Sequence, residues 1–171
     1  LIFDLITKEV ERFEPHGSHA PYGLDYNFDL FNEMLRTKLN SIKLGFTYIS
    51  PKDYLPKIGF QMIEISEHDT SFIGDPNGFC ALWCVWWAEY RLSYPDISRE
   101  DLLSMLMAEH ARYNVSFKKL IRDYGYNVTN LRDKLMEHAN INVNDWINDT
   151  MSQENINVLN DNIVKEIIKL Y

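Results

Sequence analysis

The sequence predicts an α+β fold in which a small mixed sheet, drawn from the first half of the chain, packs against helices. Short apolar runs bounded by turn residues occupy residues 1–65, a pattern typical of strands. A nearly all-apolar run begins at Cys80 and predicts a buried helix. Residues 98–171 carry amphipathic patterns with capping residues, which predict a helical extension. With 171 residues, 46% of them hydrophobic, the chain is expected to form a single domain over residues 1–171.

Strands and one helix are expected before Cys80. The strands are predicted at residues 1–6, 10–13, 44–49 and 60–65. Asn27 is a preferred helix N-cap, and the apolar residues that follow it recur every three or four positions, as on one face of a helix. These residues are Phe28, Phe31, Met34, Leu35 and Leu39. Residues 51–56 contain two prolines and are expected to form a loop.

From Cys80 onward the pattern is helical. Ser98 begins a capped helix that is expected to run to about residue 112. Further helices are predicted at residues 116–123, ending before Gly125, and then at 129–139, 144–147 and 152–170. In the helix that starts at Cys80, three indoles cover most of the circumference, which predicts a helix packed on several sides. They belong to Trp83, Trp86 and Trp87. Ligand stacking by Trp83 is the alternative.

Charge and cysteine content limit the classes of partner. The formal net charge is −8, from 25 acidic and 17 basic residues, with no cluster of Lys and Arg, so nucleic acid is not an expected partner. No apolar run reaches the ~20 residues that a membrane span needs, so no membrane partner is expected. Cys80 and Cys84 stand one helical turn apart; a disulfide there would close almost no loop, so a reducing compartment such as the cytosol is expected. Their spacing alone is not typical of a zinc site, and neither a metal nor a cofactor is expected.

A nucleophilic cysteine is the strongest chemical signal in the chain. Cys80 closely follows Gly78 and lies in the first turn of the predicted helix. Unpaired backbone N–H groups and the positive end of the helix dipole gather there and stabilise a thiolate, the form that attacks carbonyl carbon. The alternative is a small buried hydrophobic residue, because free cysteine is commonly buried. Cys84, one turn further along, is expected in the core.

The segment around Cys80 resembles the nucleophile segment of cysteine peptidases of the SUMO-protease and adenovirus-protease type, a branch of the papain-like superfamily. More narrowly, it is similar to predicted thiol proteases of large DNA viruses. The resemblance rests on the turn and Trp-rich helix, Asp75-Pro76-Asn77-Gly78-Phe79-Cys80-Ala81-Leu82-Trp83-Cys84-Val85-Trp86-Trp87-Ala88-Glu89-Tyr90, and on the hairpin over residues 1–15. The family order is His, acid, Gln, Cys. The resemblance implies that Glu14 orients the histidine, Gln61 donates to the oxyanion and Cys80 is the nucleophile. Asp75 is the rival to Gln61.

The resemblance also implies a papain-like fold and a function. The function is a cysteine peptidase that cleaves peptide or isopeptide bonds in a viral polyprotein or a ubiquitin-like conjugate. The expected location is the cytoplasm of a host cell, or the virion. The family pattern places the catalytic histidine a few residues before Leu1, so the chain is expected to lack its N-terminal part and to be inert as this fragment. Two alternatives stay open: a non-catalytic protein-binding module that retains a protease-like core, and an acyltransferase on the same scaffold.

The histidines of the chain itself are interpreted separately. His16 and His19 lie in the loop after Glu14 and are expected at the surface, with the mouth of a cleft as the alternative. His138, followed by Asn140, is a weaker candidate for a histidine that serves Cys80 from later in the sequence. The remaining two are His68, expected in a solvated loop, and His110, expected in a helix.

Overall fold

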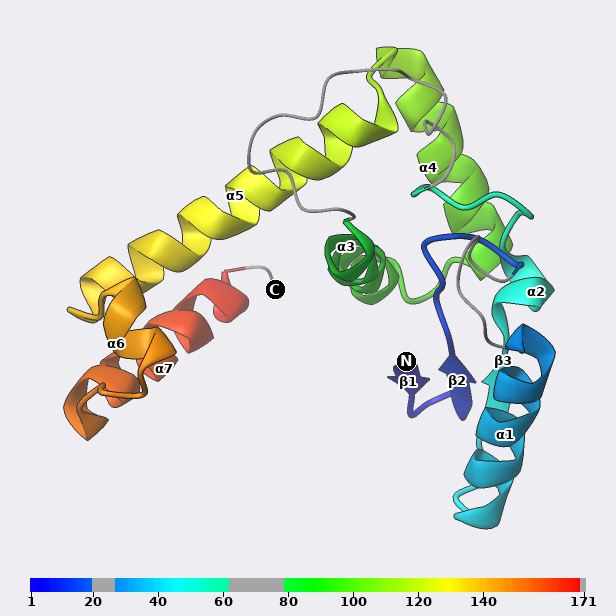
Figure 1. Ribbon diagram of the computed structural model, residues 1–171, viewed down its shortest axis with the longest axis horizontal. Helices are drawn as coiled ribbons and strands as arrows, with labels where there is room; N and C mark the ends of the chain where they lie inside the picture. The colour runs from blue at the N-terminus through cyan, green and yellow to red at the C-terminus, as the bar shows by residue number, and fades with distance from the viewer. Residues whose placement is uncertain (20–26, 62–78, 170–171) are drawn as a thin grey trace. The chain divides into compact units, whose positions relative to one another are not determined.

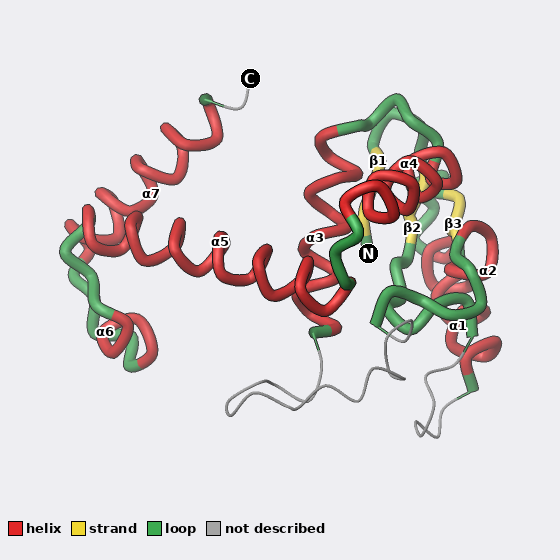
Figure 2. Tube along the Cα trace, turned by 90° about the horizontal axis from the view of Figure 1, so that it is seen from above, coloured by secondary structure: helices red, strands yellow, loops and turns green. Residues whose placement is uncertain are grey.

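The computed structural model describes residues 1–19, 27–61 and 79–169. The chain forms two compact units, Leu1–Ile121 and Arg122–Tyr171. Helices make up most of the described residues, together with one three-stranded sheet in the first unit (Figures 1 and 2). The expectation of a single domain over residues 1–171 stays a prediction.

The sheet is small and mixed. Its strands are β1 (Ile2–Asp4), β2 (Glu9–Glu11) and β3 (Thr47–Ile49). They lie in the order β1-β2-β3, with β1 antiparallel to β2 and β2 parallel to β3. Val10 pairs with Phe3 on one side and with Tyr48 on the other. Val10 and Tyr48 are buried with Leu39 and Phe46, so this cluster forms the core beneath the sheet.

The papain-like architecture predicted from the sequence is wrong. Each strand is three residues long. Lys8 and Gly45 adopt positive φ angles of 60° and 73° and turn the chain just before β2 and β3. Of the predicted strand at residues 60–65, Phe60 and Gln61 lie in a turn and the rest lies outside the described residues. The described chain is therefore mostly helical with a small sheet.

Two helices follow the hairpin. In α1 (Phe28–Ser41), the Asn27 side chain accepts a hydrogen bond from the backbone N–H of Leu30, which confirms the predicted N-cap. This helix packs beside β3 (Figure 1). Residues predicted as a loop form the short α2 (Pro51–Tyr54) instead. Its capping box is made by Ser50 and Asp53, and proline is well tolerated in a first helical turn.

The aromatic core forms around α3 (Cys80–Ser93). The tryptophans Trp83, Trp86 and Trp87 are buried, as predicted. Trp87 stacks on Phe13 with ring centroids 5.1 Å apart, and Trp83 stacks on Phe60 at 5.3 Å. These contacts fix the helix against the segment that follows β2 and against the segment that follows α2.

A buried carboxylate joins the sheet to two helices. Glu11 on β2 is 2% exposed and accepts hydrogen bonds from Trp87 Nε1 at 2.7 Å, Arg91 Nε at 3.1 Å and Arg99 Nε at 2.7 Å. Trp87 and Arg91 belong to α3, and Arg99 is the first residue of α4 (Arg99–Tyr113). We call these four residues the Glu11 cluster. It fixes the start of the chain against segments more than seventy residues away.

The second unit is helical throughout its described part. Its elements are the continuation of α5 (Phe117–His138), then α6 (Val143–Ile147) and α7 (Gln153–Ile168). The break predicted before Gly125 is wrong, because α5 continues through this residue and a glycine inside a helix costs only about 1 kcal/mol. Its buried core consists of Met136, Ala139, Ile141 and Leu159. Among the described residues, none of the helices combines the length and apolarity that crossing a membrane requires.

Candidate functional site

A thiol, an imidazole and a carboxylate meet at the start of α3. Cys80, the first residue of that helix, is partly buried. Its Sγ lies 3.9 Å from Nε2 of His16, and Nδ1 of the same ring lies 3.0 Å from Oε1 of Glu14. The fold thus brings together two of the residues singled out from the sequence, Cys80 and Glu14, through a third that was expected at the surface.

The loop after β2 places His16. Gly17 has a φ of 103°, and its N–H donates to the carbonyl of Glu14 at 2.9 Å, which turns the chain back on itself. The N–H of Gly59 then donates to the carbonyl of His16 at 3.0 Å. A Cβ added to Gly17 would lie 2.6 Å from the nitrogen of Gly59, so only glycine permits this approach. We call this contact the Gly17–Gly59 crossing.

The Glu14 carboxylate is held from several directions. Arg12 Nη1 donates to it at 3.1 Å, and the backbone N–H of His16 donates to it at 3.3 Å. The His16 side chain is 20% exposed, so it is not the solvated histidine predicted from the sequence. His19 does lie at the surface. Within the described residues, the imidazole beside Cys80 is therefore His16, which follows Glu14 in sequence and does not precede Leu1.

Gln61 also reaches the start of α3. Its side-chain oxygen accepts a hydrogen bond from the backbone N–H of Phe79 at 3.2 Å, one residue before Cys80. The backbone N–H of Gln61 donates to the carbonyl of Pro15, so Gln61 also contacts the loop that carries His16. Asp75, the rival residue, lies outside the described residues, as does His68.

The electrostatics of the thiol differ from the prediction. Burial raises the pKa of Cys80, and the nearby Glu14 carboxylate raises it further; the backbone N–H of Cys80 itself opposes them with a smaller effect. The thiol is therefore protonated at neutral pH. The helix start alone was expected to favour the thiolate. That expectation did not include the Glu14 carboxylate, which the loop after β2 places near the sulfur. Cys84, predicted in the core, is exposed.

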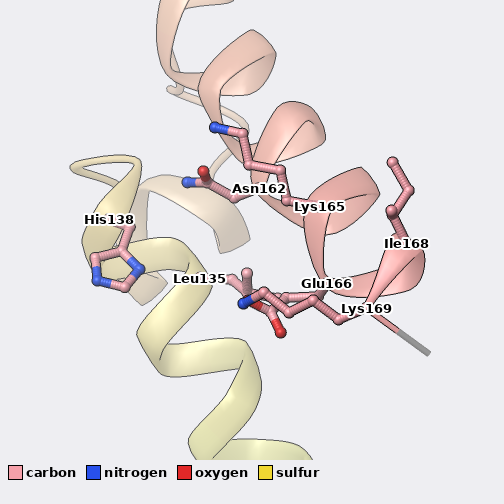
Figure 3. A pocket seen from close by; sticks show the side chains of 7 residues that line it. All are labelled: Leu135, His138, Asn162, Lys165, Glu166, Ile168 and Lys169. Atoms are coloured by element: carbon pink, nitrogen blue, oxygen red, sulfur yellow. The ribbon is translucent and has the colours of Figure 1, made fainter. Parts of the chain in front are cut away.

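The other histidines lie elsewhere. His110 stacks on Phe117, with ring centroids 3.8 Å apart. In the second unit, His138 lines a cavity of about 320 Å³ between α5 and α7 (Figure 3). The cavity is also lined by Leu135, Asn162, Lys165, Glu166, Ile168 and Lys169. Within residues 1–19, 27–61 and 79–169, no group of three or more His, Cys, Asp or Glu side chains is arranged to hold a metal ion.

Comparison with known proteins gives one relative of high similarity. The chain is 42% identical over 163 residues, 91% of its length, to a protein of Acanthamoeba polyphaga mimivirus whose name places it among candidate ankyrin repeat proteins. The chain spans 21% of that relative, so the name describes a much longer protein. No family model matches the chain, and no solved structure matches it.

These comparisons overturn the resemblance to cysteine peptidases. The similar protein is named for ankyrin repeats, and nothing in its name points to a peptidase, a hydrolase or a deubiquitinase. The assignments to the SUMO-protease type, to a papain-like fold and to cleavage of peptide or isopeptide bonds are therefore wrong. The viral origin that the resemblance implied is consistent with the source of the relative.

Proposed function

We propose that this chain is a non-catalytic protein-binding module. The observation that carries the proposal is the 42% identity to part of a viral protein named for ankyrin repeats, since repeats of that kind stack into extended binding surfaces. The chain covers only a fifth of that protein, so a binding role for this part needs support from its own surface. The first unit offers such a surface.

Exposed apolar side chains gather at the start of the chain and near the end of α3. Ile6, in the turn after β1, is 94% exposed. Leu1, Phe3, Leu5 and Leu92 are exposed as well. Residues of β1, its turn and the end of α3 line a cavity of about 270 Å³. We call these residues, together with the cavity, the β1 surface. A group of exposed apolar side chains around a cavity is typical of an interaction site.

The charged side chains that line the cavity of the β1 surface are paired with one another or with backbone N–H groups. Glu9 accepts from Arg99 Nη2 at 2.5 Å, and Arg91 and Arg99 both bind Glu11. The Asp4 carboxylate accepts from the backbone N–H groups of Ile6 and Thr7. A surface whose charges are already paired favours an apolar partner over a charged one. In the described part of the chain β1 is also one of the two outer strands of the sheet, and an outer strand can pair with an added one. The partner is therefore an extended, largely uncharged segment of another protein.

Selection from a random peptide library, followed by binding measurements on the selected peptides, tests this function. Ile6→Glu and Leu92→Glu should each weaken the affinity of a selected peptide by about 10- to 100-fold, because each removes an apolar side chain worth about 1.5–3 kcal/mol when buried. Leu30→Glu is the matched control, because Leu30 is an exposed leucine on α1. It should leave the affinity unchanged.

Two results would contradict the proposal. One is a library that yields no enriched sequence, and the other is a set of peptides that bind the Ile6 and Leu92 variants as tightly as the original chain. Ubiquitin should be included in the same binding measurements, because the sequence led us to expect a ubiquitin-like partner. The cytoplasm of the host cell, or the virion, stays the proposed location.

A further inference from the structure

We propose that Cys80 is a thiol modification site, which takes an acyl group from a thioester donor with His16 carrying the proton and Glu14 holding the imidazole. The inference is independent of the protein-binding role, because it concerns the start of α3 and not the β1 surface. It differs from an acyltransferase in that the acyl group remains on Cys80.

The geometry supplies a base for the thiol. His16 Nε2 lies 3.9 Å from the sulfur, within reach of an S–H donor. Nδ1 of the ring faces Glu14 at 3.0 Å, and a carboxylate there holds the imidazole in the tautomer whose Nε2 accepts a proton. Arg12 and the backbone N–H of His16 fix the carboxylate in turn. Each group therefore has a partner that orients it.

The proposed reaction balances without an oxidant or an energy source. The Cys80 sulfur attacks the carbonyl carbon of the donor as His16 takes the thiol proton. A new carbon–sulfur bond forms to Cys80, and the donor's carbon–sulfur bond breaks. The leaving thiolate receives the proton from His16, so one thioester replaces another and a free thiol is released.

The surroundings of the sulfur favour an acyl donor among electrophiles. Acyl transfer to sulfur passes through a tetrahedral intermediate whose oxygen carries negative charge and needs hydrogen-bond donors. The first turn of a helix supplies backbone N–H groups and a positive dipole end. The oxygen of the Gln61 amide is engaged by the N–H of Phe79, and this amide still has its NH₂ group as a donor.

The protonated thiol determines how the site should respond to pH. His16 and Glu14 face Cys80 from the loop, and Cys84 stands on the same helix. Burial and the Glu14 charge raise the pKa of Cys80. The proton must therefore be removed during the attack, and the acylation rate should rise as the pH approaches the raised pKa of the thiol.

The chain contains its own control. Cys84 is the same residue type on the same helix and is more exposed than Cys80, so exposure alone predicts that Cys84 reacts faster. Burial and Glu14 raise the pKa of the Cys84 thiol as well, so preferential acylation of Cys80 must be read together with the His16→Ala variant, which isolates the imidazole. The test incubates the full chain with the acetyl thioester of N-acetylcysteamine, followed by intact mass and peptide mapping, with hydroxylamine treatment to identify thioesters.

One acetyl group should accumulate on Cys80. His16→Ala should slow its formation by about 100-fold, the usual contribution of a positioned base, and added imidazole should restore part of the rate. Cys84→Ser should leave the rate unchanged. Glu14→Gln provides a second variant that keeps the shape of the loop and should slow acylation less than His16→Ala does.

Several results would overturn the proposal. Equal acetylation of Cys80 and Cys84 would show that His16 and Glu14 do not assist the reaction. An acetylation rate that is unchanged in His16→Ala would show the same for His16. Consumption of the donor without acetyl-Cys80 accumulating would show turnover and not a modification site. None of these results bears on peptide binding at the β1 surface, so the two proposals fail separately.

Discussion

Glu11 and Glu14 stand three residues apart at the end of the same hairpin, yet their surroundings differ completely. Glu11 is buried and accepts from an indole and two guanidinium groups. Glu14 is less buried and divides its oxygens between Arg12 and His16. The first carboxylate joins elements together, and the second orients an imidazole that faces a thiol. The role of each acid is therefore decided by which distant segments pack against this end of the hairpin.

The largest effect should come from removing the Glu11 carboxylate. Glu11→Ala leaves Arg91 and Arg99 without their buried partner, so the free energy of unfolding should fall by about 3–5 kcal/mol, measured by urea denaturation. Glu33→Ala is the control, because Glu33 pairs with Arg36 at the surface and such pairs contribute about 0–1 kcal/mol. Equal losses in the two variants would show that the Glu11 cluster does not hold the unit together.

The hydrogen bond from Trp87 tests the contribution of the same buried carboxylate, Glu11. Trp87→Phe keeps an aromatic ring against Phe13 but removes the N–H that donates to Glu11. A hydrogen bond to a charged group contributes about 1.5–3 kcal/mol, and urea denaturation should show a loss of that size. In a Glu11→Gln background the loss should be smaller, because the acceptor is then neutral. An unchanged loss would assign the effect to ring packing alone.

Changing Glu14 should alter the reactivity of Cys80 more than the stability of the fold. Glu14 raises the pKa of Cys80, so Glu14→Gln should lower that pKa and move the pH midpoint of iodoacetamide alkylation at Cys80 downward. The loss of unfolding free energy should be smaller than for Glu11→Ala, because glutamine keeps an amide oxygen that can accept hydrogen bonds now made to Glu14. A midpoint that stays in place or moves upward would contradict the assigned electrostatics.

Asp4, in the same hairpin, should give the smallest effect. Backbone N–H groups of Thr7 and Ile6 lower its pKa, so its contribution to stability is present above its ordinary pKa and is lost as the pH falls through the lowered value. Asp4→Asn should speed amide hydrogen exchange at Ile6 and Thr7 and leave global unfolding nearly unchanged. Unaltered exchange at both amides would show that the carboxylate does not hold the turn.

Local signals in the sequence predicted local structure well. Asn27 and Ser98 cap helices as expected, because a cap depends on a few neighbouring residues. The tryptophans of α3 are buried as expected. The helix at α2 was missed although its signal was present, since Ser50 and Asp53 stand at capping-box spacing around a proline.

Contacts between residues far apart in the chain could not be predicted from the sequence. His16 and Cys80 are separated by 64 positions, and no periodicity shows that the Gly17–Gly59 crossing turns the imidazole toward the thiol. The pattern Glu14-Pro15-His16-Gly17 marks a turn, which was the available hint. The thiol pKa was predicted in the wrong direction for the same reason, because the field of a helix start is local and the Glu14 carboxylate arrives from elsewhere in the chain.

The Gly17–Gly59 crossing makes the neighbourhood of Cys80 vulnerable at a position that carries no side chain. A single methyl group at either glycine would act as a wedge, since it would meet backbone atoms at 2.6 Å or closer. Such a wedge would separate imidazole from sulfur without touching either one. If random variants were screened for acylation of Cys80, substitutions at these two glycines would therefore be as damaging as loss of the thiol itself.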